Sequence, residues 1–285
     1  MTSIEFDGVS RDFATPDGRL YRALDDISFT VSAGAFAAIV GPSGCGKSTL
    51  LNIAAGLLPP SSGSVRVDHD VLAGLNRRAT YMFQQDALLP WKTVRDNVAL
   101  GLTLSGVARP QAHARANAWL GRVGLAAFGE HYPAQLSGGM RKRAAMAQNW
   151  IIDRGLVLMD EPFSALDVHT RLLMETQLLM LWDEHAESAE EHVALRAPQS
   201  PRVKKTVVFV THDLEEAIAL ADEVIVLSAG PSTRVVARHQ VTLDRPRDLM
   251  ELRTLPAFVD LYRALWVVLR EEVVRSQRAA EPTRG

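Results

Sequence analysis

The sequence predicts an α/β fold with a doubly wound core, and three observations lead to this prediction. The apolar run Phe36–Val40 has strand character and is followed by a glycine-rich loop and a helical segment. A second apolar run, Leu156–Met159, ends in two carboxylates, as expected where a buried strand emerges at the ligand-binding edge of such a sheet. The composition, 47% hydrophobic and 22% charged, allows these strands to be buried in a full core.

Charge and cysteine content narrow the class of protein. The net charge is -2 and the sequence has no basic stripe, which argues against nucleic acid as a main partner. The one cysteine, Cys45, excludes an intramolecular disulfide and fits a reducing compartment. The segment Met1–Asp7 lacks the features of a signal peptide, and no apolar stretch is long enough to cross a bilayer. We therefore expect a cytoplasmic location.

The glycine-rich loop gives the most specific prediction. It matches the phosphate-binding pattern G-x-x-x-x-G-K-[ST] and consists of Gly41, Pro42, Ser43, Gly44, Cys45, Gly46, Lys47, Ser48 and Thr49. Its backbone N–H groups and the dipole of the following helix favour a polyphosphate. We expect Lys47 to reach the outer phosphates, Ser48 to ligate Mg²⁺ and Thr49 to add a phosphate hydrogen bond. The loop thus predicts nucleotide binding.

The two carboxylates after the second apolar strand fit the same chemistry. They form a Walker B arrangement, in which Asp160 would hold Mg²⁺, usually through water. Glu161 would lie near the γ-phosphate and polarise the attacking water as a general base. A solvated strand end is the alternative interpretation of such acids, but their combination with the loop at Gly41 favours the catalytic one.

A third motif, Leu136–Met140, places a glycine loop before a helix. Ser137 is expected to cap that helix, and the N–H groups at Gly138 and Gly139 can face an anion. With these three motifs the chain resembles ATP-binding cassette (ABC) transporter ATPase subunits, whose signature sequence is LSGGQ or a close variant. The resemblance spans about residues 4–227. It implies a P-loop NTPase (RecA-like) core, an N-terminal antiparallel β subdomain and a helical subdomain that carries the signature.

The resemblance also implies roles for residues outside the three motifs. Gln84 looks like the Q-loop glutamine, which would contact Mg²⁺ or the attacking water and link the ATP site to a membrane partner; Gln85 is its alternative. Asp167, the last residue of Ser164–Asp167, matches the D-loop that crosses to a second subunit. His212 matches the switch histidine, which would contact the γ-phosphate and organise the water.

An aromatic side chain is expected to stack on the adenine ring. Phe13 is at the position where similar proteins place this ring, and Tyr21 competes for the role because the following segment varies in length. Packing in the core remains open as the alternative for either aromatic residue.

The implied mechanism requires more than one chain. In the family, ATP lies between the phosphate loop of one subunit and the signature loop of another, so we expect a homodimer with Ser137 acting in trans. Lys47, Glu161 and His212 are expected to carry catalysis, with ATP and Mg²⁺ bound. The other implied partners are an integral membrane permease and a periplasmic or extracellular solute-binding protein. The chain would then be peripheral to the cytoplasmic face of the membrane.

Four segments resemble the nitrate, sulfonate and taurine importer group: Leu89–Trp91, Met140–Arg143, Glu161–Asp167 and Asp244–Asp248. A small anion is therefore the expected solute. An exporter cassette and a non-transport ABC ATPase are the alternatives. Chromosome and repair relatives separate the phosphate loop and the signature by a long coiled coil, and ribosome-acting relatives usually carry two cassettes. Neither feature is present in this sequence.

Domain boundaries follow from the motifs. We expect a nucleotide-binding domain over residues 1–232, with a helical subdomain at about 92–150 and an insertion at about 183–205. Residues 1–35 are expected to form short strands with turns. A C-terminal extension, residues 233–285, ends in a helix that we expect to pack on the core through four residues at helical spacing: Phe258, Leu261, Leu265 and Leu269.

Overall fold

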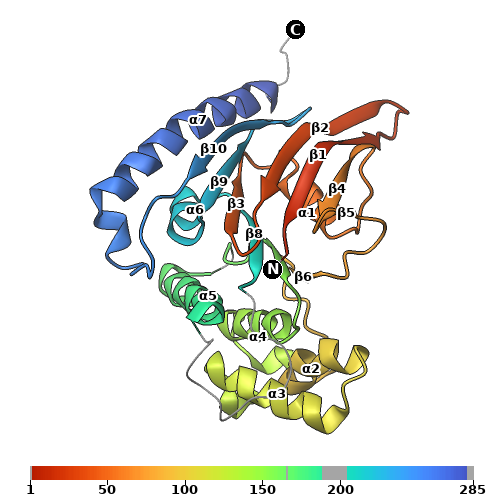
Figure 1. The fold of residues 1–285 in the computed structure, drawn as a ribbon, viewed down its shortest axis with the longest axis vertical. Helices are drawn as coiled ribbons and strands as arrows, with labels where there is room; N and C mark the ends of the chain where they lie inside the picture. The colour runs from red at the N-terminus through yellow and green to blue at the C-terminus, as the bar shows by residue number, and fades with distance from the viewer. Residues whose placement is uncertain (1, 165, 188–203, 281–285) are drawn as a thin grey trace.

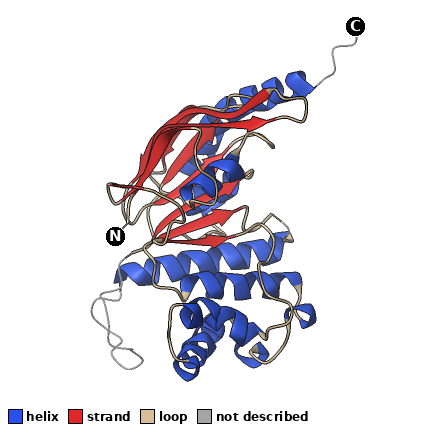
Figure 2. Ribbon diagram, turned by 90° about the vertical axis from the view of Figure 1, so that its right-hand side faces the viewer, coloured by secondary structure: helices blue, strands red, loops and turns tan. Residues whose placement is uncertain are grey.

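The computed structural model describes residues 2–164, 166–187 and 204–280. Figure 1 shows two sheets above a helical lobe, with one long helix along the outer side of the larger sheet. Figure 2 shows that further helices lie against the strands in the upper part, while the lobe below is helical. The α/β prediction is confirmed.

The smaller sheet is antiparallel and has the strand order β2-β1-β4-β5. Its strands are β1 (Ile4–Ala14), β2 (Leu20–Val31), β4 (Ser62–Val67) and β5 (Asp70–Val71). The expectation of short strands in residues 1–35 was wrong, because β1 and β2 contain 11 and 12 residues. Their pairing passes through three register shifts, so each long strand bends without ending.

The larger sheet has the order β10-β9-β3-β8-β7-β6 and is parallel except for β10. Its strands are β3 (Phe36–Val40), β6 (Ala79–Met82), β7 (Leu156–Asp160), β8 (Thr206–Thr211), β9 (Glu223–Leu227) and β10 (Val235–Gln240). All residues of β3, β7, β8 and β9 are buried, which explains their nearly continuous apolar sequences. Strand β8 lies between the parallel strands β3 and β7. The phosphate loop and the paired acids, which follow β3 and β7, therefore lie at the same carboxyl end of the sheet.

The described helices are α1 (Lys47–Ala54), α2 (Val94–Leu104), α3 (Arg109–Arg122), α4 (Gly138–Trp150), α5 (Val168–Glu187), α6 (Leu214–Leu220) and α7 (Pro256–Ala280). Short 3₁₀ turns occupy η1 (Ala126–Phe128), η2 (Pro133–Gln135) and η3 (Leu252–Thr254). Helices α2 and α3 form the lower part of the lobe, and α4 leads from it back to the sheet (Figure 1). None of these helices combines the length and apolar character needed to cross a bilayer.

Helix α7 packs on the core, as expected from its sequence. Phe258, Leu265 and Leu269 are at most 5% exposed and belong to the same apolar cluster as β3 and β8, and Leu261 packs against that cluster. Figure 1 shows α7 lying beside β10 and α6. Of the expected insertion at 183–205, residues 188–203 lie outside the described part of the chain.

Candidate nucleotide-binding and catalytic site

The phosphate loop joins β3 to α1 and requires glycine at two positions. Gly44 and Gly46 have φ angles of 76° and 97°, which L side chains rarely adopt. The Lys47 ammonium group donates to the carbonyl oxygens of Gly41 at 2.9 Å and Pro42 at 3.0 Å. Lys47 is 6% exposed, so its charge is held within the loop. This geometry places a buried cation and a helix N-terminus together, as an anion site requires.

The remaining loop side chains differ in exposure. Ser43 and Ser48 are exposed, and Thr49 is half-buried. Cys45 is 2% exposed, and burial raises the pKa of its thiol. Cys45 therefore packs beneath the loop, whereas the serine hydroxyls are available to a ligand.

Strand β7 brings the first carboxylate to the phosphate loop. The Ser48 hydroxyl donates to Asp160 Oδ1 at 2.9 Å, and the Tyr81 hydroxyl donates to Asp160 Oδ2 at 3.3 Å. Burial raises the pKa of Asp160, partly opposed by these two hydrogen bonds. Hydroxyl and carboxylate oxygens are the ligands that Mg²⁺ prefers, so Ser48 and Asp160 fit such an ion. Sequence reasoning missed Tyr81, because no motif marks it and only the pairing of β6 with β7 brings it here.

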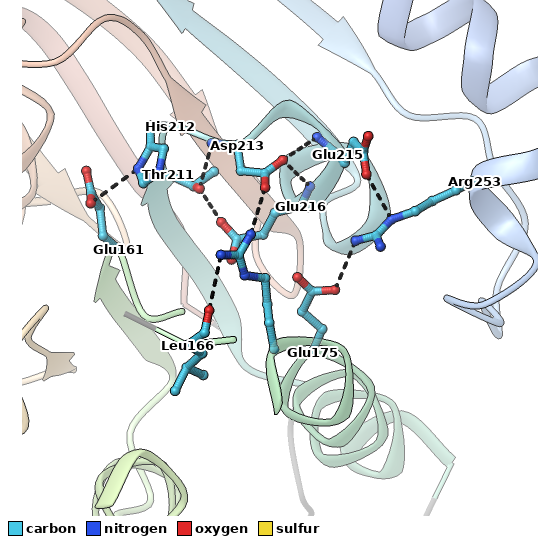
Figure 3. Close-up of polar contacts among 10 residues, drawn as sticks. Glu161, Leu166, Glu175, Thr211, His212, Asp213, Glu215, Glu216 and Arg253 are labelled. Atoms are coloured by element: carbon cyan, nitrogen blue, oxygen red, sulfur yellow. Dashed lines mark hydrogen bonds and ion pairs between the residues drawn. The ribbon is translucent and has the colours of Figure 1, made fainter. Parts of the chain in front are cut away.

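The second carboxylate lies at the centre of a three-residue cluster. Gln84 Nε2 donates to Glu161 Oε2 at 3.2 Å, and His212 Nδ1 lies 3.3 Å from the same oxygen (the His212 contact is drawn in Figure 3). Glu161 has φ +43°, a left-handed conformation that is uncommon outside glycine. Such strained residues cluster at functional sites. The structure thus brings three predicted site residues together, and it is Gln84 rather than Gln85 that contacts Glu161.

The signature loop has the expected helix cap. Ser137 Oγ accepts a hydrogen bond from the Met140 backbone N–H at 3.3 Å, and both Ser137 and Gly138 are exposed. A Cβ at Gly139 would come within 2.7 Å of Thr170 Cγ2, so α4 and α5 approach closely there. Among the described residues, no hydrogen bond or ion pair joins this loop to the phosphate loop. One chain therefore presents the two predicted anion sites separately.

The D-loop aspartate begins helix α5. Asp167 is exposed, and its Oδ1 accepts from the Thr170 N–H at 3.0 Å. Hydrogen bonding to the Thr170 side chain, and then to its backbone N–H, lowers the pKa of Asp167. Ala165 of the same motif lies outside the described residues.

The two candidate adenine-stacking residues are cross-strand neighbours. Phe13 on β1 is directly opposite Tyr21 on β2. Phe13 is half-buried, with the Arg11 guanidinium 4.8 Å above its ring, and Tyr21 is 40% exposed. Neither belongs to the buried core, so core packing does not explain them. Because directly opposite residues share one face of a sheet, both rings are available to the same ligand.

A polar network behind His212 was not predicted. The Thr211 hydroxyl donates to Glu216, and the Asp213 N–H donates to Thr211 Oγ1 at 3.0 Å. Arg171 Nη1 donates to Asp213 Oδ2 at 3.1 Å (Figure 3). Burial raises the pKa of Glu216 to about 8. These contacts fix the residues on both sides of His212, and no sequence motif marks Glu216 or Arg171.

Comparisons with known proteins identify the family of this chain. The family model described as ABC transporter matches residues 24–164. An uncharacterised ABC transporter ATP-binding protein of Methanocaldococcus jannaschii is 39% identical over 260 residues, covering 91% of this chain and 89% of that protein. The chain therefore belongs to the ABC transporter ATP-binding proteins and is an ATP-binding, ATP-hydrolysing cassette.

Two further relatives and a solved structure are also similar. The taurine import ATP-binding protein TauB of Rhizobium johnstonii is 39% identical over 270 residues, which is 93% of this chain and 96% of TauB. TauB of Yersinia pestis is 41% identical over 216 residues, covering 76% and 77% of the two chains. The dimeric ATP-binding cassette MJ0796, in a post-hydrolysis state with ADP and Pi, matches with a TM-score of 0.68 and 28% identity, over 85% of this chain and all of that one.

Proposed function

We propose that this cassette hydrolyses ATP to power an importer of taurine, another sulfonate, nitrate or a similar small anion. The similarity to two taurine import proteins over most of their length supports the direction of transport and the class of solute. The solute itself would be chosen by a permease and a periplasmic or extracellular binding protein. The cassette would lie on the cytoplasmic face of the membrane.

We further propose that two copies of the chain sandwich ATP. The signature loop at Ser137 is exposed, so the signature loop of a second copy would complete each site. The dimeric state of the solved cassette MJ0796 supports this arrangement. Asp167, which is exposed at the start of α5, would face the partner cassette.

An open groove beside the Q-loop suits the permease. It has a volume of about 460 Å³ and its lining includes Leu57, Leu75, Tyr81 and Phe83. Three of these residues, Leu57, Leu75 and Phe83, are between 44% and 65% exposed. Exposed apolar side chains grouped in a groove favour a protein partner. Because Phe83 precedes Gln84, a partner in this groove would be one residue from the catalytic cluster.

Mg²⁺ would be held by Ser48, Asp160 and Gln84. When bound, the ion would neutralise negative charge on the phosphate oxygens of ATP. Lys47 would bind the outer phosphates as a buried cation. Glu161 would accept a proton from the water that attacks the γ-phosphorus. His212 and Gln84, which both contact Glu161 Oε2, would hold its carboxylate toward that water.

One observation carries the proposal: the Glu161 carboxylate contacts both Gln84 and His212 next to the phosphate loop. The first test compares ATP hydrolysis by the wild type, Glu161→Gln and His212→Ala, with dimer formation followed by light scattering. We expect each variant to lose at least about 100-fold in rate. Both should keep ATP affinity within about twofold, since neither residue belongs to the phosphate loop. Glu161→Gln should form a stable dimer in MgATP.

The outcomes separate the catalytic and transport parts of the proposal. Retained hydrolysis in Glu161→Gln would contradict its role as the general base. For transport, the cassette is reconstituted with the permease encoded beside it, in vesicles containing ATP. Uptake of radiolabelled taurine or nitrate that is abolished by Glu161→Gln supports import. Movement of solute only out of the ATP-containing compartment would overturn it in favour of an exporter.

A further inference from the structure

Arg253, in the C-terminal extension, reaches the polar network behind His212. Arg253 lies in η3, outside the strands that carry the ATP site. Its Nη2 lies 3.5 Å from Glu175 Oε2 on α5, and its Nε lies 3.2 Å from Glu215 Oε2 in the first turn of α6. Figure 3 shows Arg253 entering from the C-terminal part of the chain between these two helices. One guanidinium thus bridges α5 and α6.

The cluster that receives Arg253 has more acids than arginines. Four carboxylates, those of Glu175, Asp213, Glu215 and Glu216, face two guanidinium groups, those of Arg171 and Arg253. Glu175 is fully buried, so repulsion from the other acids acts on it in a low dielectric. Arg253 is the cation that contacts Glu175. Its loss would leave the buried Glu175 side chain without the cation that most favours its charged form.

The first turn of α6 connects the contacts of Arg253 to the backbone of His212. Asp213 follows His212 directly and is the N-cap of α6, where its Oδ1 accepts from the N–H groups of Glu215 at 2.9 Å and Glu216 at 3.3 Å. Any shift of the first turn of α6 therefore moves Asp213 and, with it, the backbone of its neighbour. A displacement of about 1 Å in a catalytic group can cost on the order of 100-fold in rate.

We propose that Arg253 is a positioning residue for the switch histidine: it holds the first turn of α6 against α5 and so keeps His212 against Glu161. The proposal rests on the catalytic role proposed for His212. It gives the C-terminal extension a direct effect on ATP hydrolysis, separate from its packing on the core. Arg253 touches neither nucleotide nor water in this scheme.

The test uses the full chain with ATP as the probe. Arg253→Ala should lower kcat between about 5- and 50-fold while KM for ATP changes less than about twofold. Arg253→Lys, which keeps the charge near Glu175, should recover part of kcat. The double variant Arg253→Ala with Glu175→Gln should also recover, because it removes the unpaired buried carboxylate together with its partner.

Arg263→Ala is the matched control. Arg263 lies on α7 in the same extension, is 75% exposed at its side chain and pairs with Asp260 of the same helix. It should keep the wild-type kcat. Wild-type kcat in Arg253→Ala would overturn the inference, and so would a loss that neither Arg253→Lys nor the double variant recovers. Both results are distinguishable from failure of the proposed mechanism, which would instead appear as unimpaired hydrolysis in His212→Ala.

Discussion

Asp160 and Glu161 are adjacent in the chain but lie in different surroundings. Asp160 ends the buried strand and is held by hydroxyl groups from Ser48 and Tyr81. Glu161 turns away from that direction because its φ is +43°, and its side chain, 21% exposed, meets Gln84 and His212. A single change of backbone direction thus separates the carboxylate proposed to hold Mg²⁺ from the one proposed to accept a proton.

The local motifs made most of this site predictable from the sequence. The loop from Gly41 to Thr49 and the two acids after β7 are contiguous segments, so their spacing alone identifies them. Tyr81 and Glu216 could not be predicted in this way. Each contacts the site only after strands or a helix from other parts of the chain pair with it, and an isolated Tyr or Glu has no distinguishing pattern.

The two candidate aromatic residues predict how single side chains affect ATP binding. Because Phe13 and Tyr21 are opposite one another on one face, we expect Phe13→Ala and Tyr21→Ala each to raise the Kd for ATP. Loss of one stacking partner costs about 1 kcal/mol, or roughly fivefold in Kd. Fluorescence titration with ATP and with inorganic triphosphate gives the comparison. Triphosphate affinity should stay unchanged, and an equal loss for both ligands would rule out stacking on adenine.

The positions of the strands were easier to predict from the sequence than their lengths. The two apolar runs expected as strands, Phe36–Val40 and Leu156–Met159, form β3 and most of β7, because buried parallel strands are short apolar runs with polar ends. In the first 35 residues, β1 and β2 are interrupted by polar residues, so their alternation resembled several short strands. Bulges and cross-strand pairing hold each as one strand, and these are not visible in the sequence.

The contact between α6 and β8 predicts how stability depends on pH. Glu216 on α6 is 4% exposed and accepts from Thr211 on β8, and burial raises its pKa from 4.5 to about 8. Between these values the folded protein holds a proton that the unfolded chain has released. The contribution of Glu216 to the free energy of unfolding is therefore complete below pH 4.5. It decreases as the pH rises and is lost above about pH 8.

The measurement is urea unfolding of the wild type and Glu216→Gln at pH 5 and pH 7. We expect Glu216 to account for a loss of about 3 kcal/mol over this interval, which the glutamine variant should not show. Glu175, whose pKa burial raises to about 7, adds a change of the same sign in both proteins. Glu271→Gln, at an exposed position of α7, serves as the control and should follow the wild type. Parallel pH curves for wild type and Glu216→Gln would contradict the assignment.

In the molecule as a whole, the C-terminal extension shares a hydrophobic core with the strands that lead to the ATP site. Leu265 on α7 is fully buried in the cluster that includes β3 and β8. The sequence predicted that α7 packs on the core from the spacing of its apolar residues. It did not predict Arg253, because ion pairs across three elements leave no periodic pattern.

This shared core predicts a single cooperative unfolding transition. Leu265→Ala should lower the free energy of unfolding of the whole chain by about 2–5 kcal/mol, through lost burial and a cavity. Val267→Ala, two residues away but 60% exposed, should change it by less than about 0.5 kcal/mol. Urea unfolding followed by fluorescence and circular dichroism provides the test. A separate early transition for α7, with the main transition unmoved in Leu265→Ala, would show that the helix unfolds independently.

The central place of β8 in the larger sheet has a consequence for synthesis of the chain. Strands β3 and β7 leave the ribosome earlier, yet each pairs with β8 and neither pairs with the other. Until β8 has been made, both therefore keep an open, apolar edge, which is the kind of edge that recruits strands from other molecules. A nascent chain paused within α5 would carry a complete phosphate loop and both acids but no joined sheet.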